Sequence, residues 1–244
     1  MKYNDVVFVG DPHSSFKELF ERINTYHNTC FIVLGDSNIG MNIKTDQVNA
    51  LFSYLEYFNN RNKELEEKGN MLYIMRGNHC NPAFFEKELV KFSNLKTVKD
   101  YSIININEQN FLFIGGGISL NRKDLALDMT YWIDEKVVFK DDVLRDLRNI
   151  DFVCTHTTPN FCKPLGINSD IVRHYCSLDS KLYIELLEER YLITRIFDIL
   201  NQNNKIKGHF YGHFHYSFQE KINETMHVLL NIMEFRSLNE IFPY

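Results

Sequence analysis

Seven side chains of this 244-residue sequence have the donor types of a metal site. They comprise two carboxylates, one amide and four imidazoles, with no thiolate: Asp11, His13, Asp36, Asn78, His156, His213 and His215. Such a mixture of nitrogen and oxygen donors favours divalent ions such as Mn, Fe or Zn. Seven side chains are too many for one tetrahedral ion. The sequence therefore predicts two ions that share a bridging carboxylate, a geometry that serves in-line attack on phosphorus.

Four of these polar clusters come directly after short, continuous apolar runs, which are typical of strands buried on both faces. The runs are 6–9, 31–34, 72–75 and 152–154. In open α/β sheets, ligands gather outside the carboxyl ends of the strands, so the clusters are expected to meet there. The fifth cluster, Gly212–His215, follows the weaker run 206–211, and its two histidines would share one side of an extended segment.

Helical patterns alternate with the apolar runs, and this alternation predicts an α/β domain with much parallel sheet. The expected helices span 15–26, 45–59, 82–92, 141–148 and 178–200. Hairpins over 101–114, with its second strand at 111–114, and over 216–231 would add antiparallel strands and make the sheet mixed. No linker or internal repeat divides the chain, so one domain over 1–244 is expected. The segment 162–177 is predicted to be a loop that covers the site.

The order D-x-H, G-D, G-N-H, H and G-H-x-H resembles the calcineurin-like metallophosphoesterase superfamily. The resemblance implies an αββα fold, in which a mixed β-sheet sandwich is flanked by helices. It also implies that Asp11, His13 and His215 hold one ion and that Asn78, His156 and His213 hold the other. Asp36 would bridge the two ions, with manganese expected and iron or zinc as alternatives. A metal-bound hydroxide would attack the phosphate ester, and His79 would act as general acid or stabilise transition-state charge.

The segment Gly115–Ser119, followed by Arg122 and by residues 131–135, is similar to a pattern of some bacterial and phage members. Arg122 is the candidate for docking the phosphoryl group, and on this basis a phosphomonoester is the preferred substrate. The motif Gly35–Gly40 lacks the second aspartate and the arginine of the protein phosphatase branch. Cys80 stands where that branch has an acidic residue, so the resemblance to that branch does not support protein phosphatase activity.

Two alternatives use the same residues differently. A nuclease or nucleotide phosphodiesterase would need a groove for nucleic acid, and the net charge of -5 argues against a broad duplex-binding surface. A non-catalytic scaffold of the same fold would be expected to lose ligands or the histidine of G-N-H, and the sequence keeps all of them. The expected partner is a phosphorylated small molecule, nucleotide or phosphoprotein.

The remaining signals concern the cysteines and the surroundings of the protein. Five cysteines without a C-x-x-C pair indicate neither a disulfide framework nor a thiolate zinc site. No apolar run has the length of a signal peptide core or a membrane span, and a cytoplasmic location is expected. His209 fits none of the motifs and is predicted to be structural. Cys80 is interpreted as a small buried filler.

Overall fold

Two β-sheets lie face to face in the computed structural model, which describes residues 2–44, 46–165 and 169–243. The first sheet has the order β11-β1-β2-β3-β4, with strands Phe235–Ser237, Asp5–Val9, Thr29–Val33, Met71–Ile74 and Leu95–Thr97. The second has the order β5-β6-β7-β8-β10-β9, with strands Ile103–Ile106, Gln109–Ile114, Phe152–Thr155, Gly208–Tyr211, Thr225–Leu229 and Phe218–Ile222.

The central strands of both sheets run parallel, and the edge strands β11, β5 and β9 are antiparallel to their neighbours, whereas the edge strand β4 is parallel to β3. β1 pairs in parallel with β2 and antiparallel with β11, while β7 pairs in parallel with both β6 and β8. The two predicted hairpins are confirmed as β5-β6 and β9-β10. The mixed α/β architecture expected from the sequence is therefore confirmed.

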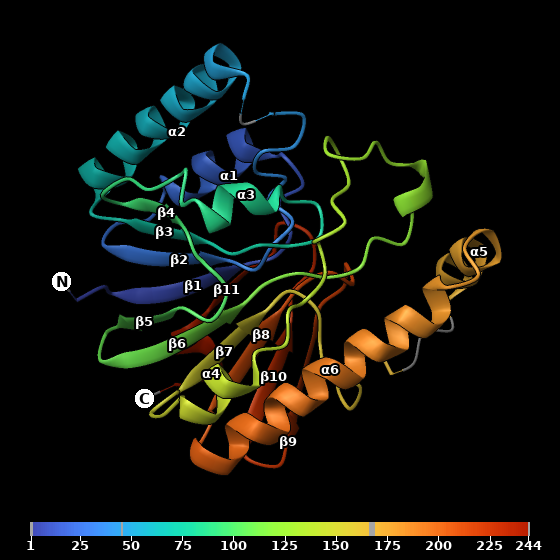
Figure 1. Ribbon diagram of the computed structural model, residues 1–244. Helices are drawn as coiled ribbons and strands as arrows, with labels where there is room; N and C mark the ends of the chain where they lie inside the picture. The colour runs from blue at the N-terminus through green and yellow to red at the C-terminus, as the bar shows by residue number, and fades with distance from the viewer. Residues whose placement is uncertain (1, 45, 166–168, 244) are drawn as a thin grey trace.

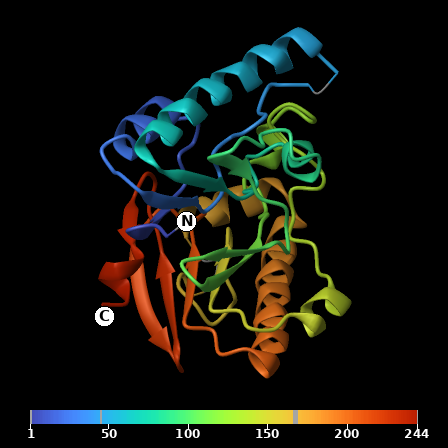
Figure 2. The ribbon, with the colours of Figure 1, turned by 90° about the vertical axis from the view of Figure 1, so that its left-hand side faces the viewer.

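Helices cover the outer faces of both sheets (Figures 1 and 2). On the first sheet these are α1, α2 and α3, and on the second they are α4 and α6, with α5 packed against α6. The helix bounds, together with the short C-terminal helix α7, are Phe16–Ile23, Val48–Lys68, Pro82–Glu86, Asp141–Asp146, Asp170–Leu178, Leu182–Asn203 and Leu238–Ile241. The layers thus follow the αββα order. Within the described residues, no helix is long and apolar enough to cross a membrane.

Burial on both faces explains the continuous apolar runs. In β1, Phe8 points into the core between the sheets, where its ring stacks on that of Phe210 with a centroid separation of 3.5 Å. Its neighbours Val7 and Val9 point the other way and pack beneath the helices of the first sheet. Because every side chain of such a strand is buried, no polar alternation develops.

Several predicted bounds differ from the observed ones. The helix predicted over 82–92 ends at Glu86, and Glu88 adopts a left-handed backbone with φ 49° that turns the chain toward β4. The helix predicted over 45–59 begins at Val48 and continues to Lys68, where Gly69 caps it; position 45 lies outside the described residues.

The prediction of a loop over 162–177 is wrong for its second half. Residues Asp170–Leu178 form α5, whose first turn is capped by the Ser169 side chain accepting a hydrogen bond from the amide of Val172. Positions 166–168 of that prediction lie outside the described residues. A serine cap before a short amphipathic stretch is the signal that identifies this helix.

Candidate metal centre

The predicted ligands follow the carboxyl ends of strands from both sheets. Asp11 and His13 follow β1, Asp36 follows β2, Asn78 follows β3, His156 follows β7, and His213 and His215 follow β8. The side chains meet in two adjacent groups, which correspond to the more exposed and the more buried half of the centre.

The outer half contains Asp11, His13 and His215, whose donor atoms all lie within 4.8 Å of one another. The Nε2 atoms of His13 and His215 are 2.9 Å apart, and His215 Nε2 lies 3.5 Å from Asp11 Oδ2. Asp11 is fully buried, whereas the His215 side chain is 44% exposed. This half can therefore be reached from solvent.

The inner half contains Asp36, His156 and His213, and Asn78 joins it through His156. His156 Nε2 lies 3.2 Å from Asp36 Oδ1 and 3.0 Å from Asn78 Oδ1. The two halves touch where His156 Nδ1 comes within 3.9 Å of Asp11 Oδ1. All seven predicted side chains are thus gathered at one place.

Unusual backbone conformations aim these side chains. His13, Asp36, His213 and His215 all have left-handed backbones, with φ between 39° and 69°. Such conformations cost energy for residues other than glycine, and they cluster at functional sites. The neighbouring Gly212 is required by space, because a Cβ there would lie 2.1 Å from Asp11 Oδ1.

Hydrogen bonds behind the ligands fix their orientation. His156 Nδ1 donates to the Leu34 carbonyl at 2.8 Å, which fixes the ring so that Nε2 faces Asp36 and Asn78. Asn78 Nδ2 donates to Ser119 Oγ at 2.9 Å, and Ser119 Oγ donates to Glu135 at 2.6 Å. Because the Asn78 amide nitrogen is held this way, its oxygen points into the centre.

Ser119 and Glu135 were missed as functional residues by the sequence analysis. Both belong to the segments 115–119 and 131–135, which carried the resemblance but received no role. Arg76 holds the second segment in place, since its guanidinium donates to the Glu135 carbonyl at 2.7 Å and pairs with Asp100 at 2.7 Å.

The electrostatics of the centre suit cations. Burial lowers the pKa of His13 to about 4 and that of His213 to about 3, so both imidazoles are neutral at neutral pH. Burial raises the pKa of Asp11 to about 7. At Asp36 burial opposes ionisation, but the charge and hydrogen bond of His156 lower the pKa well below its usual range.

One carboxylate oxygen of the centre, Asp11 Oδ1, has an unfavourable environment. Asp11 Oδ1 is buried and has no hydrogen-bond partner within the part of the chain that the structure describes. A buried carboxylate oxygen without a partner is costly, and a divalent cation would satisfy it. The neutral imidazoles and the oxygen donors are the ligand types such ions take, so the residues fit the predicted metals.

His79 lies beside the ligands with its side chain partly exposed. Its backbone N–H donates to Asp36 Oδ1 at 2.9 Å, and its ring meets that of His13 edge to face, with centroids 5.8 Å apart. Among the described residues, no side chain hydrogen-bonds to its imidazole. Cys80 is fully buried with Sγ 3.6 Å from Ser37 Oγ, which agrees with its interpretation as a filler.

Arg122 is engaged with two carboxylates. Its Nε donates to Asp179 Oδ2 at 2.8 Å, and its Nη1 donates to Glu185. These ion pairs tie the short 3-10 turn Arg122–Asp124 to the start of α6. The role predicted for Arg122 in docking a phosphoryl group stays a prediction, and its contacts favour a structural role.

One solved structure of another protein shares this architecture. No curated protein matches the sequence. That solved structure superposes with a TM-score of 0.54 at 12% identity, covering 97% of this chain and 95% of its own. Two others have lower TM-scores: phosphopantetheinyl hydrolase from Mycobacterium tuberculosis (0.49, 13% identity, 98% and 96% coverage) and a putative 5'-nucleotidase from Staphylococcus aureus (0.48, 12% identity). The latter match covers 96% of this chain and 50% of the nucleotidase.

The family model described as calcineurin-like phosphoesterase matches residues 5–217, a range that contains every predicted ligand and most of the chain. This chain belongs to the calcineurin-like phosphoesterase family.

Proposed function

We propose that this protein hydrolyses phosphate esters at a centre of two divalent metal ions. The observation that carries the proposal is the buried, unpartnered oxygen of Asp11 among neutral imidazoles. A scaffold that binds no metal would gain nothing from such an arrangement, because a buried carboxylate oxygen without a partner costs stability. The family membership supports the same reaction class.

The seven side chains divide naturally between two ions. Asp11, His13 and His215 would hold the outer ion, and Asn78, His156 and His213 the inner one. Asp36 is the proposed bridge. When bound, the ions would activate water as a nucleophile and neutralise charge on the phosphate oxygens. We propose manganese as the first ion to test, with iron and zinc as alternatives.

His79 is proposed to act on the leaving group. Its partly exposed imidazole lies next to His13 in the outer half, which substrate can reach from solvent. The hydrogen bond from its backbone to Asp36 ties its position to that of the bridge. From there it would donate a proton to the departing oxygen or stabilise the charge that develops on it.

Phosphomonoesters are the proposed substrate class, with phosphodiesters as the second candidate. A monoester dianion benefits from cationic donors beyond the metals, and Arg122 was the best candidate in the sequence. Its engagement with Asp179 and Glu185 favours the second candidate, because a diester carries less charge to neutralise. We further propose one domain over 1–244 and a cytoplasmic location.

A substrate screen with Mn²⁺ tests these proposals. The purified chain would be assayed with p-nitrophenyl phosphate, its bis-ester, nucleotides and phosphopeptides. Metal-dependent hydrolysis of at least one ester is expected, and the ratio of the first two rates separates monoesterase from diesterase. An absence of hydrolysis with Mn²⁺, Fe²⁺ and Zn²⁺ would favour the scaffold alternative.

A further inference from the structure

A second group of potential ligands lies on the outer face of the second sheet. Cys162, His209 and His227 form this group, hereafter the thiol–histidine cluster. His209 in β8 and His227 in β10 are direct partners in the parallel strand register, so their side chains emerge side by side. Cys162 reaches them from the segment that follows β7.

The donor atoms are close enough to share one ion. His209 Nδ1 and His227 Nδ1 are 3.0 Å apart, and Cys162 Sγ lies 3.1 Å from His227 Nδ1. In a tetrahedral zinc site with Zn–N near 2.1 Å and Zn–S near 2.3 Å, neighbouring donors lie about 3.3–3.6 Å apart. The donors of these two pairs would need to separate by only a few tenths of an ångström, and all three donor atoms lie within 4.8 Å of one another.

The hydrogen bonds around His209 indicate that its Nδ1 is unprotonated and has a free lone pair. Thr155 Oγ1 donates its single proton to the Thr157 carbonyl, which can only accept. The 2.7 Å contact between Thr155 Oγ1 and His209 Nε2 must therefore be a donation from the imidazole. His209 Nδ1 is then unprotonated and faces His227, as in metal-bound histidines whose other nitrogen donates to a protein oxygen.

Only one of the two contacts of His227 Nδ1 can be a full hydrogen bond at a time. His227 Nδ1 makes short contacts with both His209 Nδ1 and Cys162 Sγ. If it carries a proton and donates it to His209, it cannot accept the thiol proton. If it is unprotonated and accepts from the thiol, two lone pairs face each other across 3.0 Å. A cation would accept lone pairs from all three atoms.

The surroundings are those of a shielded site. His209 and Cys162 are fully buried, and His227 is 2% exposed. The ring of Tyr211 stacks on His209 at 4.7 Å, and that of Phe197 from α6 meets it edge to face at 4.7 Å. An apolar shell of this kind excludes bulk water and strengthens ligand bonds.

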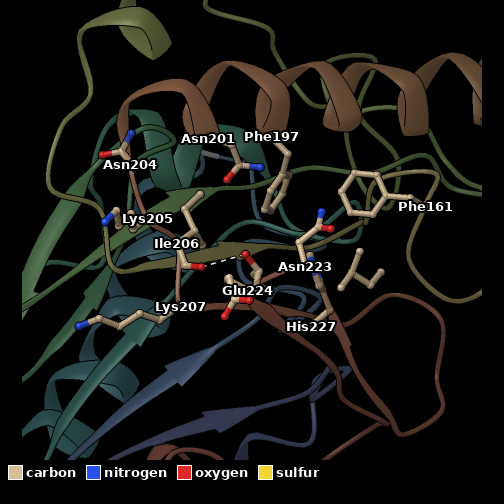
Figure 3. Close-up of a pocket in the computed structure, with 12 residues that line it drawn as sticks. Phe161, Phe197, Asn201, Asn204, Lys205, Ile206, Lys207, Asn223, Glu224 and His227 are labelled. Carbon is tan, nitrogen blue, oxygen red and sulfur yellow. Dashed lines mark hydrogen bonds between the residues drawn. The ribbon is translucent and has the colours of Figure 1, made fainter.

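A cavity of about 670 Å³ borders the cluster at His227 (Figure 3). His227 lines it together with Phe161 and Phe197, and the turn that joins β9 to β10 forms its rim. The cavity lies before the amino end of β8, at the opposite end of that strand from His213. Its volume leaves room for water molecules beside His227.

We propose that Cys162, His209 and His227 form a mononuclear Zn²⁺ site, separate from the candidate metal centre, with water from the cavity as fourth ligand. One thiolate and two imidazoles are ligands typical of zinc, and the set differs from the thiolate-free ligands of the first centre. The ion would cross-link β8, β10 and the segment after β7. Thiolate ligation releases the proton of Cys162 to solvent.

Cobalt substitution tests the proposal without relying on activity. The chain would be stripped of metal with a chelator and titrated with Co²⁺, which gives a thiolate-to-cobalt charge-transfer absorption only where sulfur binds. The wild type and Cys176→Ser, which changes a partly exposed cysteine of α5, should both show the band. Cys162→Ser should lack it, and Zn²⁺ in excess of all the metal sites should abolish it in the wild type.

Two results would overturn the site: absence of the band in the wild type, or its persistence in Cys162→Ser. Near-ultraviolet circular dichroism would verify that Cys162→Ser is folded. If it is not, X-ray absorption of the zinc-loaded wild type replaces the variant. That spectrum should contain sulfur at about 2.3 Å from zinc, and a spectrum with only nitrogen and oxygen neighbours would refute the proposal.

Discussion

The two histidine clusters at β8 are built in different ways. The candidate metal centre uses residues after strand ends, and four of its ligands have left-handed backbones. The thiol–histidine cluster uses His209 and His227 within regular, paired strands, plus one residue of a connecting segment. The candidate metal centre is partly open to solvent at His215, whereas the three side chains of the thiol–histidine cluster are buried.

This difference has a physical reason. Loops at the ends of several parallel strands can turn many donors toward one point, at the cost of strained backbone. Paired strands present only one side chain each to a given neighbourhood, so few donors can meet. The first arrangement leaves positions open for a substrate, and the second suits an ion held mainly by protein. The predictions below test whether the two clusters are independent.

The largest effect is expected from Asp36→Asn. An amide lacks the negative charge that a bridge between two cations needs, so hydrolysis should fall to the background rate and Mn²⁺ content should drop. Metal analysis and a p-nitrophenyl phosphate assay measure both quantities. The cobalt–thiolate band should remain as strong as in the wild type. Loss of that band as well would mean that the two clusters depend on each other.

His79→Ala should lower kcat by roughly 10²–10⁴-fold, the usual contribution of a positioned acid or base. Metal content should stay at the wild-type level, because His79 is not a predicted ligand. His27→Ala, an exposed histidine before β2, is the matched control and should keep the wild-type rate. If metal is lost together with activity, His79 is a ligand and the proposed division of roles is wrong.

The sequence predicted that the seven side chains of the first cluster meet, because they adjoin glycines and strand ends. In Gly212–His215 and in Gly35–Asp36, a glycine that favours a turn stands within a few residues of a side chain that can bind a metal. The second cluster has no such local signal. His227 belongs to no motif, and its contact with His209 depends on a strand register that only the folded sheets define.

The same limit explains the errors in the fold. The edge strands β4 and β11 have three residues each, too few for a periodic signal. The roles of Ser119 and Glu135 arise where two loops meet, and no spacing in the sequence indicates that contact. Long buried strands are predictable because hydrophobicity alone defines them, whereas contacts between loops depend on the whole fold.

Ser119→Ala should weaken Mn²⁺ binding by roughly 10–100-fold, the usual effect of removing a group that orients a ligand. Without Ser119 Oγ, the Asn78 amide can rotate and present nitrogen to the ion. The Mn²⁺ concentration that gives half-maximal activity measures the change. Ser177→Ala on α5 is the control. Equal Mn²⁺ dependence in Ser119→Ala and the wild type would remove Asn78 from the ligand set or Ser119 from its support.

Zinc affinity at the thiol–histidine cluster should rise about tenfold per pH unit between pH 6 and 8. Burial raises the pKa of Cys162 to about 12, with Glu220 adding to the shift and Arg190 opposing it, so the thiol is protonated in this range. Burial lowers the pKa of His227 to about 4, and that of His209 is also lowered, so neither competes. Binding therefore displaces one proton. Titrations of the cobalt band, with Zn²⁺ as competitor, at pH 6.5 and 7.5 would detect the change, and equal affinities would contradict thiolate ligation.

The smallest effect on catalysis is expected from Arg122→Ala. This variant tests whether Arg122 belongs to the substrate-binding site. Because its guanidinium is occupied by Asp179 and Glu185, KM for p-nitrophenyl phosphate should change by less than about threefold. The free energy of unfolding should fall by about 1–3 kcal/mol, since the side chain loses charged hydrogen bonds that are only slightly exposed. Urea denaturation measures this loss, and Glu185→Gln should reproduce part of it.

The competing expectation for Arg122 is that it leaves those carboxylates and docks the phosphoryl group. In that case KM for the monoester should rise by an amount equivalent to roughly 1.5–3 kcal/mol, while KM for the bis-ester changes less. Glu185→Gln would then free the arginine and lower KM for the monoester. The two variants move KM in opposite directions only if Arg122 binds substrate, because a purely structural ion pair affects stability alone.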